Sequence, residues 1–168
     1  MTTLGLLILR VAVGLILAAH GAQKLFGWWG GQGMVGWTGA MTRMRVRPAL
    51  AWAWVSALAE FLGGLAVVVG LLSPLGNFAL AASMLAAIAL VHWPKGFWVG
   101  KGGYEFNLLI LAVVAGLALV GPGNYSLDHL LGIHLPEPLT LAVGTVATIA
   151  GAGFALVTRS RPSAEPKP

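Results

Sequence analysis

Five long apolar runs, separated by short polar segments, dominate the hydropathy pattern of the chain. They cover residues 4–26, 49–72, 75–93, 106–121 and 139–157. Each run has roughly the length that a helix needs to cross the hydrocarbon core of a bilayer. The runs lack the strict apolar–polar alternation of barrel strands, so the pattern predicts membrane-spanning helices. We therefore expect an all-α protein: a polytopic transmembrane helical bundle with a fifth span at its C-terminal end.

The segments between the runs carry the residues that end helices. Pro74 follows the second run, Pro94 closes the third, GPGN closes the fourth, and PEP precedes the fifth. We expect one transmembrane domain over residues 1–158 and a disordered, proline-rich tail over residues 159–168. Because Arg10 interrupts the first run and no basic residue precedes it, we expect this run to be a retained helix rather than a cleaved signal peptide.

Two glycine-rich segments lie outside the runs. WGGQGMVGWTG covers residues 29–39 and GKGG covers residues 100–103. The first lacks the GK[ST] ending of a phosphate-binding loop and follows no strand, so nucleotide binding is excluded there. We expect a re-entrant or interfacial turn in both segments.

Composition supports a membrane protein and excludes several other classes. The chain is 58% hydrophobic and only 9% charged, whereas soluble domains carry about 25% charged residues. The net charge of +5 does not indicate nucleic acid binding, because the charges lie at the ends of the runs. The chain has no cysteine, which excludes disulfides, thiol relays and cysteine-based metal sites.

The distribution of charge predicts the orientation in a bacterial cytoplasmic membrane. Lysines and arginines occupy the segments after the first and third runs and after the fifth, and the other two connecting segments contain neither. By the positive-inside rule the N-terminus lies outside and the C-terminus in the cytoplasm. Seven tryptophans gather near the predicted cytoplasmic ends, and for most of them we expect a role in the aromatic belt at headgroup depth.

Charged side chains inside the apolar runs are the strongest functional signal. Each costs about 2.5–3.5 kcal/mol at bilayer depth, so it needs a partner, water or a function. Arg10 and Lys24 share one face of the first run, and His20 lies at its edge. Glu60 lies near the middle of the second run, with small residues on its face that let another helix approach closely. Either Arg10 or Lys24 could reach Glu60 from an antiparallel neighbour.

Further ionisable groups should lie at the same membrane face as Lys24. His92 ends the third run and Glu105 opens the fourth, so hairpin topology places both beside His20. We expect these groups to line a polar pocket together with Glu60. Structural alternatives stay open: the charges could be ion pairs that fix helix register, and the lysines near helix ends could snorkel. Two histidines without a spacing motif are weak evidence for a metal, and we predict none. Asp128 and the two histidines after it are expected to be solvated or helix-capping.

Several segments resemble the DoxX family of membrane proteins. They are RVAVGLILAAHGAQKLFG from Arg10, EFLGGL from Glu60, HWPKGFW from His92 with GGYE up to Glu105, and GPGNYSLD up to Asp128. DoxX-like proteins are usually four-helix membrane proteins. The resemblance therefore implies a DoxX-like four-helix core, to which residues 139–157 add a fifth span.

The resemblance also implies a redox association, since the family is named after a subunit of a thiosulfate:quinone oxidoreductase. It places Glu60 and Glu105 as catalytic proton donors. It places the ligand-binding positions at four residues: Arg10, His20, Lys24 and His92. A quinone would enter from the lipid, accept a hydrogen bond from His20 or Lys24, and receive protons from a carboxyl group. The sequence carries no flavin, haem or iron–sulfur motif, so electrons would come from a soluble or membrane redox partner.

Two other classes of function fit the same residues. The charges could line a pathway for a proton, an ion or a small solute, as in transporters. Alternatively, the basic face could hold peripheral proteins, which makes the chain a membrane scaffold. Membrane lipids are expected partners in every case, and the glycine faces allow a homo-oligomer.

Overall fold

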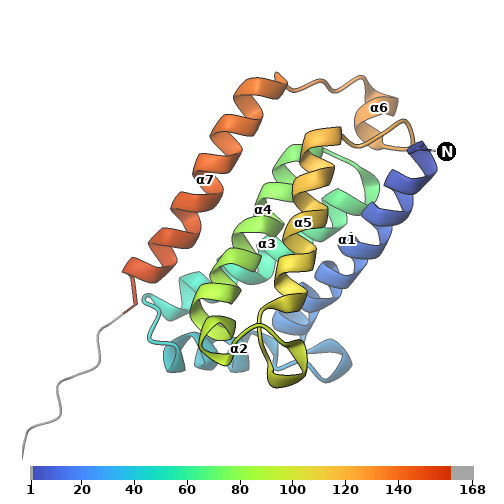
Figure 1. The fold of residues 1–168 in the computed structure, drawn as a ribbon. Coiled ribbons are helices and arrows are strands. Elements are labelled where there is room, and N and C mark those ends of the chain that lie inside the picture. The colour runs from blue at the N-terminus through green and yellow to red at the C-terminus, as the bar shows by residue number, and fades with distance from the viewer. Residues whose placement is uncertain (1, 160–168) are drawn as a thin grey trace, which may run out of the picture.

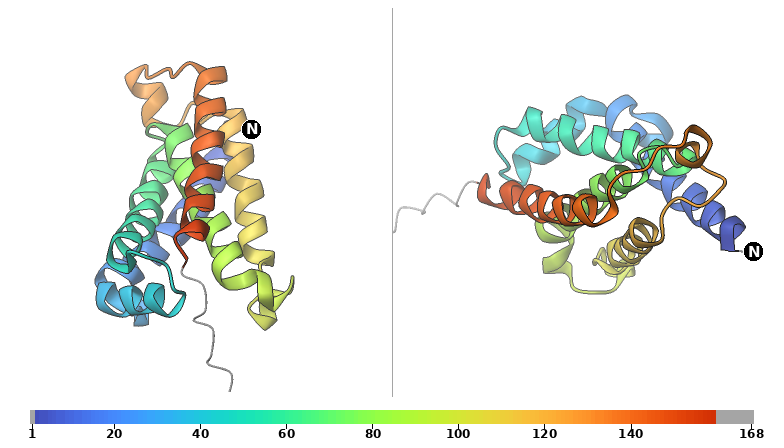
Figure 2. Two further views of the ribbon diagram at one scale, coloured as in Figure 1. Left: turned by 90° about the vertical axis from the view of Figure 1, so that its left-hand side faces the viewer. Right: turned by 90° about the horizontal axis from the view of Figure 1, so that it is seen from above.

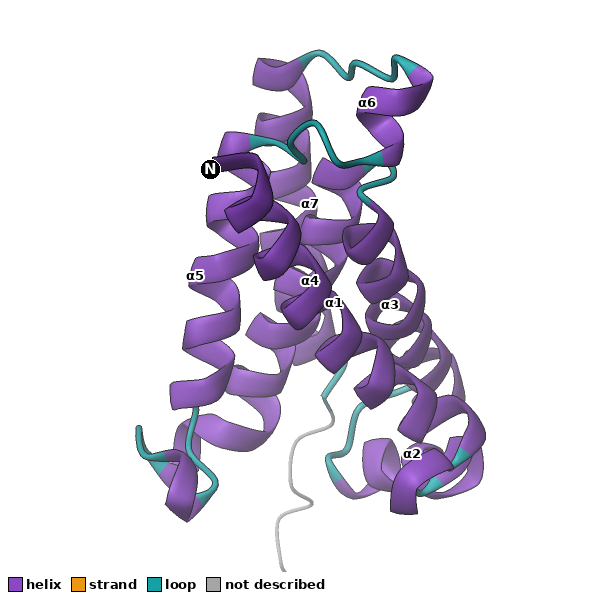
Figure 3. Cartoon of the chain, turned by 90° about the vertical axis from the view of Figure 1, so that its right-hand side faces the viewer, coloured by secondary structure: helices purple, strands orange, loops and turns teal. Residues whose placement is uncertain are grey.

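The computed structural model describes residues 2–159 and shows a bundle of helices without strands over that range (Figures 1 and 3). The long helices are α1 (Thr2–Phe26), α3 (Ala49–Val69), α4 (Ser73–Ala87), α5 (Glu105–Val120) and α7 (Glu137–Val157). Two shorter helices, α2 (Gly33–Arg43) and α6 (Leu127–Leu131), lie at opposite ends of the bundle (Figure 1). The all-α bundle predicted from the apolar runs is thus confirmed for the described residues.

Four helical stretches are long and apolar enough to span a membrane: Thr2–Phe26, Ala49–Val69, Ser73–Lys95 and Glu137–Val157. The third includes a π-helical segment, Ile88–His92, that continues α4. Helix α5 has 16 residues and is the short member of the set. Whether α5 also crosses the bilayer stays a prediction, as do the orientation of the termini and the disorder of residues 160–168, which lie outside the described part.

The contact between α1 and α3 depends on glycines. A Cβ atom on Gly64 would lie 2.6 Å from the backbone oxygen of Gly14, and one on Gly21 would lie 2.4 Å from the backbone nitrogen of Phe61. Helices in a membrane gain little from excluding water, so close backbone approach of this kind supplies much of their attraction. The sequence placed these glycines on the faces that carry Arg10, Lys24 and Glu60, and the structure brings those faces together.

Helix α4 is central to the bundle, because it packs against α3, α5 and α7. Between α1, α3, α4 and α5 lies an apolar core that includes Leu17, Val67, Leu80 and Val114, all nearly inaccessible. Helix α7 lies along α4, as the two views of Figure 2 show. The helices therefore separate two ends of the molecule, and each end holds one charged side chain of α1: Arg10, which is buried, and Lys24, which is half-buried.

The glycine-rich segment 29–39 differs from its prediction. A turn was expected, but residues from Gly33 onward form α2, which packs on α1 and α3 at the lower end in Figure 1. Met34, Trp37 and Met41 follow a helical spacing and pack toward α3. The tertiary packing of this face outweighs the poor helix propensity of its glycines. The second glycine segment does form a turn after a short 3-10 helix, Val99–Lys101.

Candidate functional site

The last turn of α1 and the middle of α3 bring two opposite charges together. The Lys24 Nζ atom lies 2.5 Å from Oε2 of Glu60. Glu60 is only 3% exposed, whereas 17% of the Lys24 side chain remains accessible. Of the two cations considered for Glu60, the structure selects Lys24. The pairing offsets the cost of a carboxylate at this depth.

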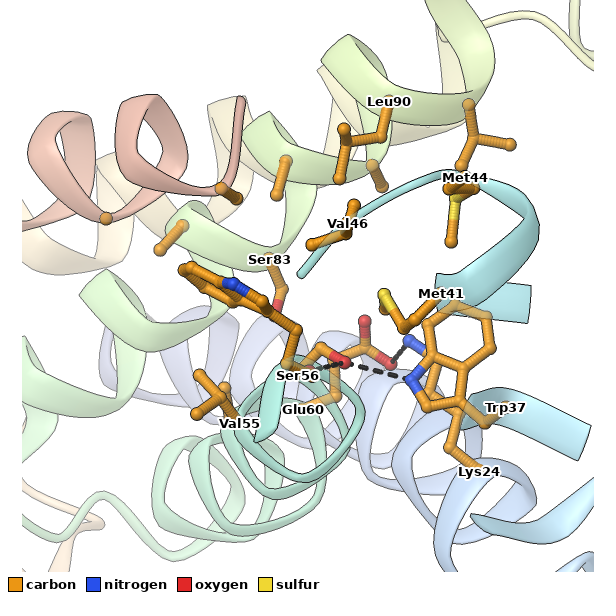
Figure 4. A pocket seen from close by; sticks show the side chains of 18 of the residues that line it. Lys24, Trp37, Met41, Met44, Val46, Val55, Ser56, Glu60, Ser83 and Leu90 are labelled. Atoms are coloured by element: carbon orange, nitrogen blue, oxygen red, sulfur yellow. Dashed lines mark hydrogen bonds and ion pairs between the residues drawn. The ribbon is translucent and has the colours of Figure 1, made fainter. Parts of the chain in front are cut away.

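This ion pair lies at one end of an apolar cavity of about 300 Å³ (Figure 4). Helices α2, α3 and α4, the π-helical segment and two small residues of α7 form the walls, and Lys24 and Glu60 are the two ionisable groups among the lining residues. Such a cavity, mostly apolar with a few convergent polar groups, has the character of a small-molecule site. Figure 4 shows one Glu60 oxygen directed at Lys24 and the other turned toward the cavity.

Trp37 and Ser56 complete the polar end of the cavity. The Trp37 indole donates a hydrogen bond to Ser56 Oγ at 2.9 Å, and its ring lies 4.4 Å from Lys24 Nζ. The Ser56 hydroxyl lies 2.8 Å from the backbone oxygen of Trp52, one turn earlier in α3. The indole is therefore held in place by a hydrogen bond and a cation–π contact. Together these residues form the polar part of the lining of an otherwise apolar cavity.

One part of the cavity wall is open to the surroundings of the bundle. Val55 lines the cavity and is itself 55% exposed, so the space reaches the outer surface of α3. Helix α3 is long and apolar enough to span a membrane, so this exposed surface is the side on which lipid is expected.

Arg10, which was predicted to bind the ligand and considered as a partner of Glu60, lies at the opposite end of the bundle. It is 2% exposed, and its guanidinium donates to the backbone oxygens of Pro122, Tyr125 and Val68. It does not line the cavity. These contacts fasten the segment between α5 and α6 onto α1 and α3, which is a structural task.

Asp128 supports the same end of the molecule. Its two carboxylate oxygens accept hydrogen bonds from the backbone N–H groups of Leu72 and Ser73, at 2.7 and 2.9 Å. Asp128 thus caps α4, a helix 55 residues away in sequence, and is buried while doing so. Ser126 caps the start of α6 through His129. Helix capping was one of the two expectations for Asp128, and burial excludes the solvated alternative.

The remaining predicted site residues lie outside the cavity. His20 is exposed on α1. His92 bonds through Nδ1 to the backbone oxygen of Gly102 at 2.7 Å, and Glu105 accepts from the backbone N–H of Val99 at 2.9 Å. Both therefore order the loop between α4 and α5. Of the six residues predicted to share a site, the structure brings only Lys24 and Glu60 together in this space.

Sequence reasoning missed the contribution of α2 to the site. Trp37 was assigned to the aromatic belt, and Met41 received no role. Both line the cavity. Their spacing of four residues, with Met34 three residues earlier, is a helical face that the intervening glycines concealed.

Comparison with known proteins identifies relatives of this chain. The family model described as DoxX matches residues 5–93. A protein of Bacillus subtilis (strain 168) named "Putative oxidoreductase CatD" is 32% identical over 125 residues, which are 74% of this chain and 85% of that protein. No solved structure matches. The matched family segment contains every wall of the cavity except the part contributed by α7.

Proposed function

Because this chain belongs to the DoxX family of membrane proteins, we propose that it binds a quinone in the Lys24–Glu60 cavity and serves as the quinone-reactive subunit of a membrane redox complex. The observation that carries the proposal is the position of the ion pair. A cation and a carboxylate, both largely withdrawn from water, face an apolar space that reaches the lipid side of the bundle. The oxidoreductase name of the Bacillus subtilis relative points in the same direction.

The residues divide the chemical work in a simple way. Lys24 donates a hydrogen bond to a quinone carbonyl, and Glu60 exchanges a proton with the same oxygen as the ring is reduced or oxidised. Reduction of a quinone to a quinol takes up two electrons and two protons, one at each carbonyl oxygen; Glu60 passes a proton to the oxygen beside it, and the other oxygen takes its proton from solvent. A separate electron-donor protein supplies the electrons. The apolar walls hold the ring, and Trp37 offers it an aromatic edge.

The alternative functions find less support in the geometry. A solute pathway would need a polar route from Glu60 toward the Arg10 end, but the apolar core around Leu17 and Val67 fills the bundle there. A scaffold that binds peripheral proteins would use the exposed arginines near α2 and would have no need of the ion pair. Both alternatives make predictions for Glu60→Gln that differ from those of quinone binding.

The direct test is mass spectrometry of an organic extract from the gently purified protein. We expect a quinone enriched over bulk phospholipid in the wild type and lost in Glu60→Gln. Glu105→Gln is the matched control, because it makes the same chemical change outside the cavity and should retain the quinone. Circular dichroism and gel filtration would establish that both variants fold.

Two results would contradict the proposal: no enrichment in the wild type, or equal enrichment in folded Glu60→Gln. If Glu60→Gln fails to fold, Lys24→Met provides a second test of quinone binding. Because Lys24 lies near the end of α1, its replacement should lower the stability of the protein less than that of Glu60. The double variant Lys24→Glu/Glu60→Lys restores opposite charges. This double variant should fold but should not bind the quinone. If the pair were purely structural, the double variant would contain as much quinone as the wild type.

A further inference from the structure

A second cavity, whose lining is more polar, adjoins the apolar one at the Lys24 end. It has a volume of about 240 Å³, and its lining consists of six residues: Gln23, Lys24, Gly30, Gly31, Gln32 and Trp37. Lys24 and Trp37 belong to the linings of both cavities. The two spaces therefore border the same lysine side chain and the same indole ring.

The glycine-rich segment after α1 builds the rim of this second cavity. Gly27 and Gly30 adopt positive φ angles of 74° and 79°, which turn the chain back over the end of α1. Gly31 then lies against Gln23 so closely that a Cβ atom would be 2.4 Å from its backbone oxygen. The folded-back segment places the polar side chains of Gln23 and Gln32 at the mouth, at the end of the molecule where α2 lies (Figure 1).

The two cavities differ in chemical character and meet at Lys24 and Trp37. The larger one is almost wholly apolar, whereas the lining of the smaller one includes two glutamine side chains and two glycines. A site that exchanges protons with a lipid-borne ligand needs both kinds of access. The hydrophobic ligand must arrive from the membrane, and the protons must arrive from water.

We infer that the cavity rimmed by Gln23, Gly31 and Gln32 is the aqueous port of the site, through which protons pass by way of Lys24 to Glu60, and that Trp37 is the partition that keeps bulk water out of the apolar cavity. That this route carries protons rests on the proposed function. The access of water through the port, and its exclusion from the apolar cavity by Trp37, do not, because both can be measured without any quinone.

The fixed position of Trp37 is what makes it a partition rather than a surface residue. Its indole nitrogen is held by Ser56 and its ring by Lys24, so the ring stays between the two spaces. Removal of the ring would join them. Removal of Trp52, which lines the apolar cavity but not the polar one, would enlarge the apolar cavity without opening it to the port.

The absence of cysteine from the chain allows a clean accessibility experiment. Ser83→Cys places a thiol of nearly the same size in the wall of the apolar cavity. The probe is a membrane-impermeant trimethylammonium methanethiosulfonate, added to one side of sealed vesicles at a time. Since the thiolate is the reactive form, labelling reports contact with water. Gln32→Cys and Asn124→Cys serve as markers for the two membrane sides.

We expect Trp37→Ala to raise the labelling rate of Ser83→Cys by about tenfold or more, from the side that labels Gln32→Cys only. Trp52→Ala should change that rate by less than about twofold. Equal acceleration by the two tryptophan variants, labelling from the Asn124→Cys side, or no acceleration by Trp37→Ala would overturn the port. Trp37→Leu replaces Trp37→Ala if the latter fails to fold.

The outcome separates this inference from the proposed function. If Trp37→Ala accelerates labelling but the wild type contains no quinone, the port is supported and quinone binding is wrong. If Glu60→Gln loses a bound quinone but Trp37→Ala does not accelerate labelling, quinone binding is supported and the port is wrong.

Discussion

Two charges of the same helix, one buried and one half-buried, have opposite surroundings in this protein. Arg10 and Lys24 lie on one face of α1, four turns apart, and both reach partners that involve α3. Arg10 is bound to backbone oxygens and lines no part of the cavity, whereas Lys24 pairs with a carboxylate that faces open apolar space. A charge within a membrane helix is therefore not by itself a sign of function. Lys24 differs from Arg10 because a cavity and a carboxylate that can exchange a proton lie beside it.

The Arg10 end also differs in what its polar groups contact. Arg10, Ser126 and Asp128 bind backbone groups of loops and helix ends. Such contacts satisfy main-chain groups that the bilayer cannot hydrate. At the other end Lys24 donates to the Glu60 side chain and Trp37 to the Ser56 side chain, and all four residues border a space. Substitutions at the first end should therefore change stability, and substitutions at the second end should change ligand binding.

The largest effect on stability is expected for Arg10→Met. It removes hydrogen bonds to three carbonyl groups, so the free energy of unfolding should fall by about 3 kcal/mol or more. Unfolding in mixed detergent micelles measures this change. Arg43→Met, at an exposed arginine, is the control and should stay within about 0.5 kcal/mol of the wild type. The folded fraction of Arg10→Met should keep its quinone, and loss of quinone from that fraction would remove the distinction between the two ends.

The second effect concerns α7, the cavity wall outside the matched family segment. A Cβ atom on Gly144 would lie 2.0 Å from the Phe78 ring, whereas one on Gly151 would meet nothing within 4 Å. Gly144→Ala should therefore lower the free energy of unfolding by about 1–3 kcal/mol. Gly151→Ala, on the same helix, should change it by less than about 0.5 kcal/mol. Equal effects would show that α7 is not held against α4 in this register.

A smaller effect is expected for Asp128→Asn. The amide retains one acceptor for the start of α4 and loses the charge that favours a helix N-terminus. The expected cost is about 1 kcal/mol. Hydrogen exchange of the Leu72 and Ser73 amides gives a local measurement. These amides should exchange faster in the variant, while those of α2 remain unchanged. Equal acceleration throughout the chain would instead indicate a global loss of stability.

The smallest effect is expected for His20→Gln. His20 was predicted to bind the ligand, but it is exposed and does not line the cavity. Its replacement should change neither the free energy of unfolding nor the quinone content beyond experimental error. A loss of quinone from folded His20→Gln would return this histidine to the site and would require a different ligand position.

Much of the fold follows from the sequence because lipid demands long apolar helices. The helices lie close to the five predicted runs, and the small residues near Glu60 and Arg10 do mark the α1–α3 contact. The choice of Lys24 over Arg10 as the partner of Glu60 could not be predicted. Two of the three partners of Arg10 are carbonyl groups of a loop more than one hundred residues away, the third is a carbonyl group of α3, and a carbonyl carries no sequence signal.

The cavity was predictable only in part. Lys24 and Glu60 stood out because charge is expensive in a membrane. Trp37 and Met41 did not, because they depend on a glycine-rich segment that becomes helical only by packing on α3. His92 and Glu105 were placed correctly at the end where the cavity lies, but their hydrogen bonds hold a loop rather than line the space.

The most direct test of the account is photoaffinity labelling of the purified protein with an azidoquinone, followed by peptide mapping. The account predicts adducts on residues 37–60 and 79–91, competed by unlabelled quinone and lost in folded Glu60→Gln. Adducts that persist in Glu60→Gln, or that gather around Arg10 and residues 121–126, would contradict the assignment of ligand binding to the Lys24–Glu60 end.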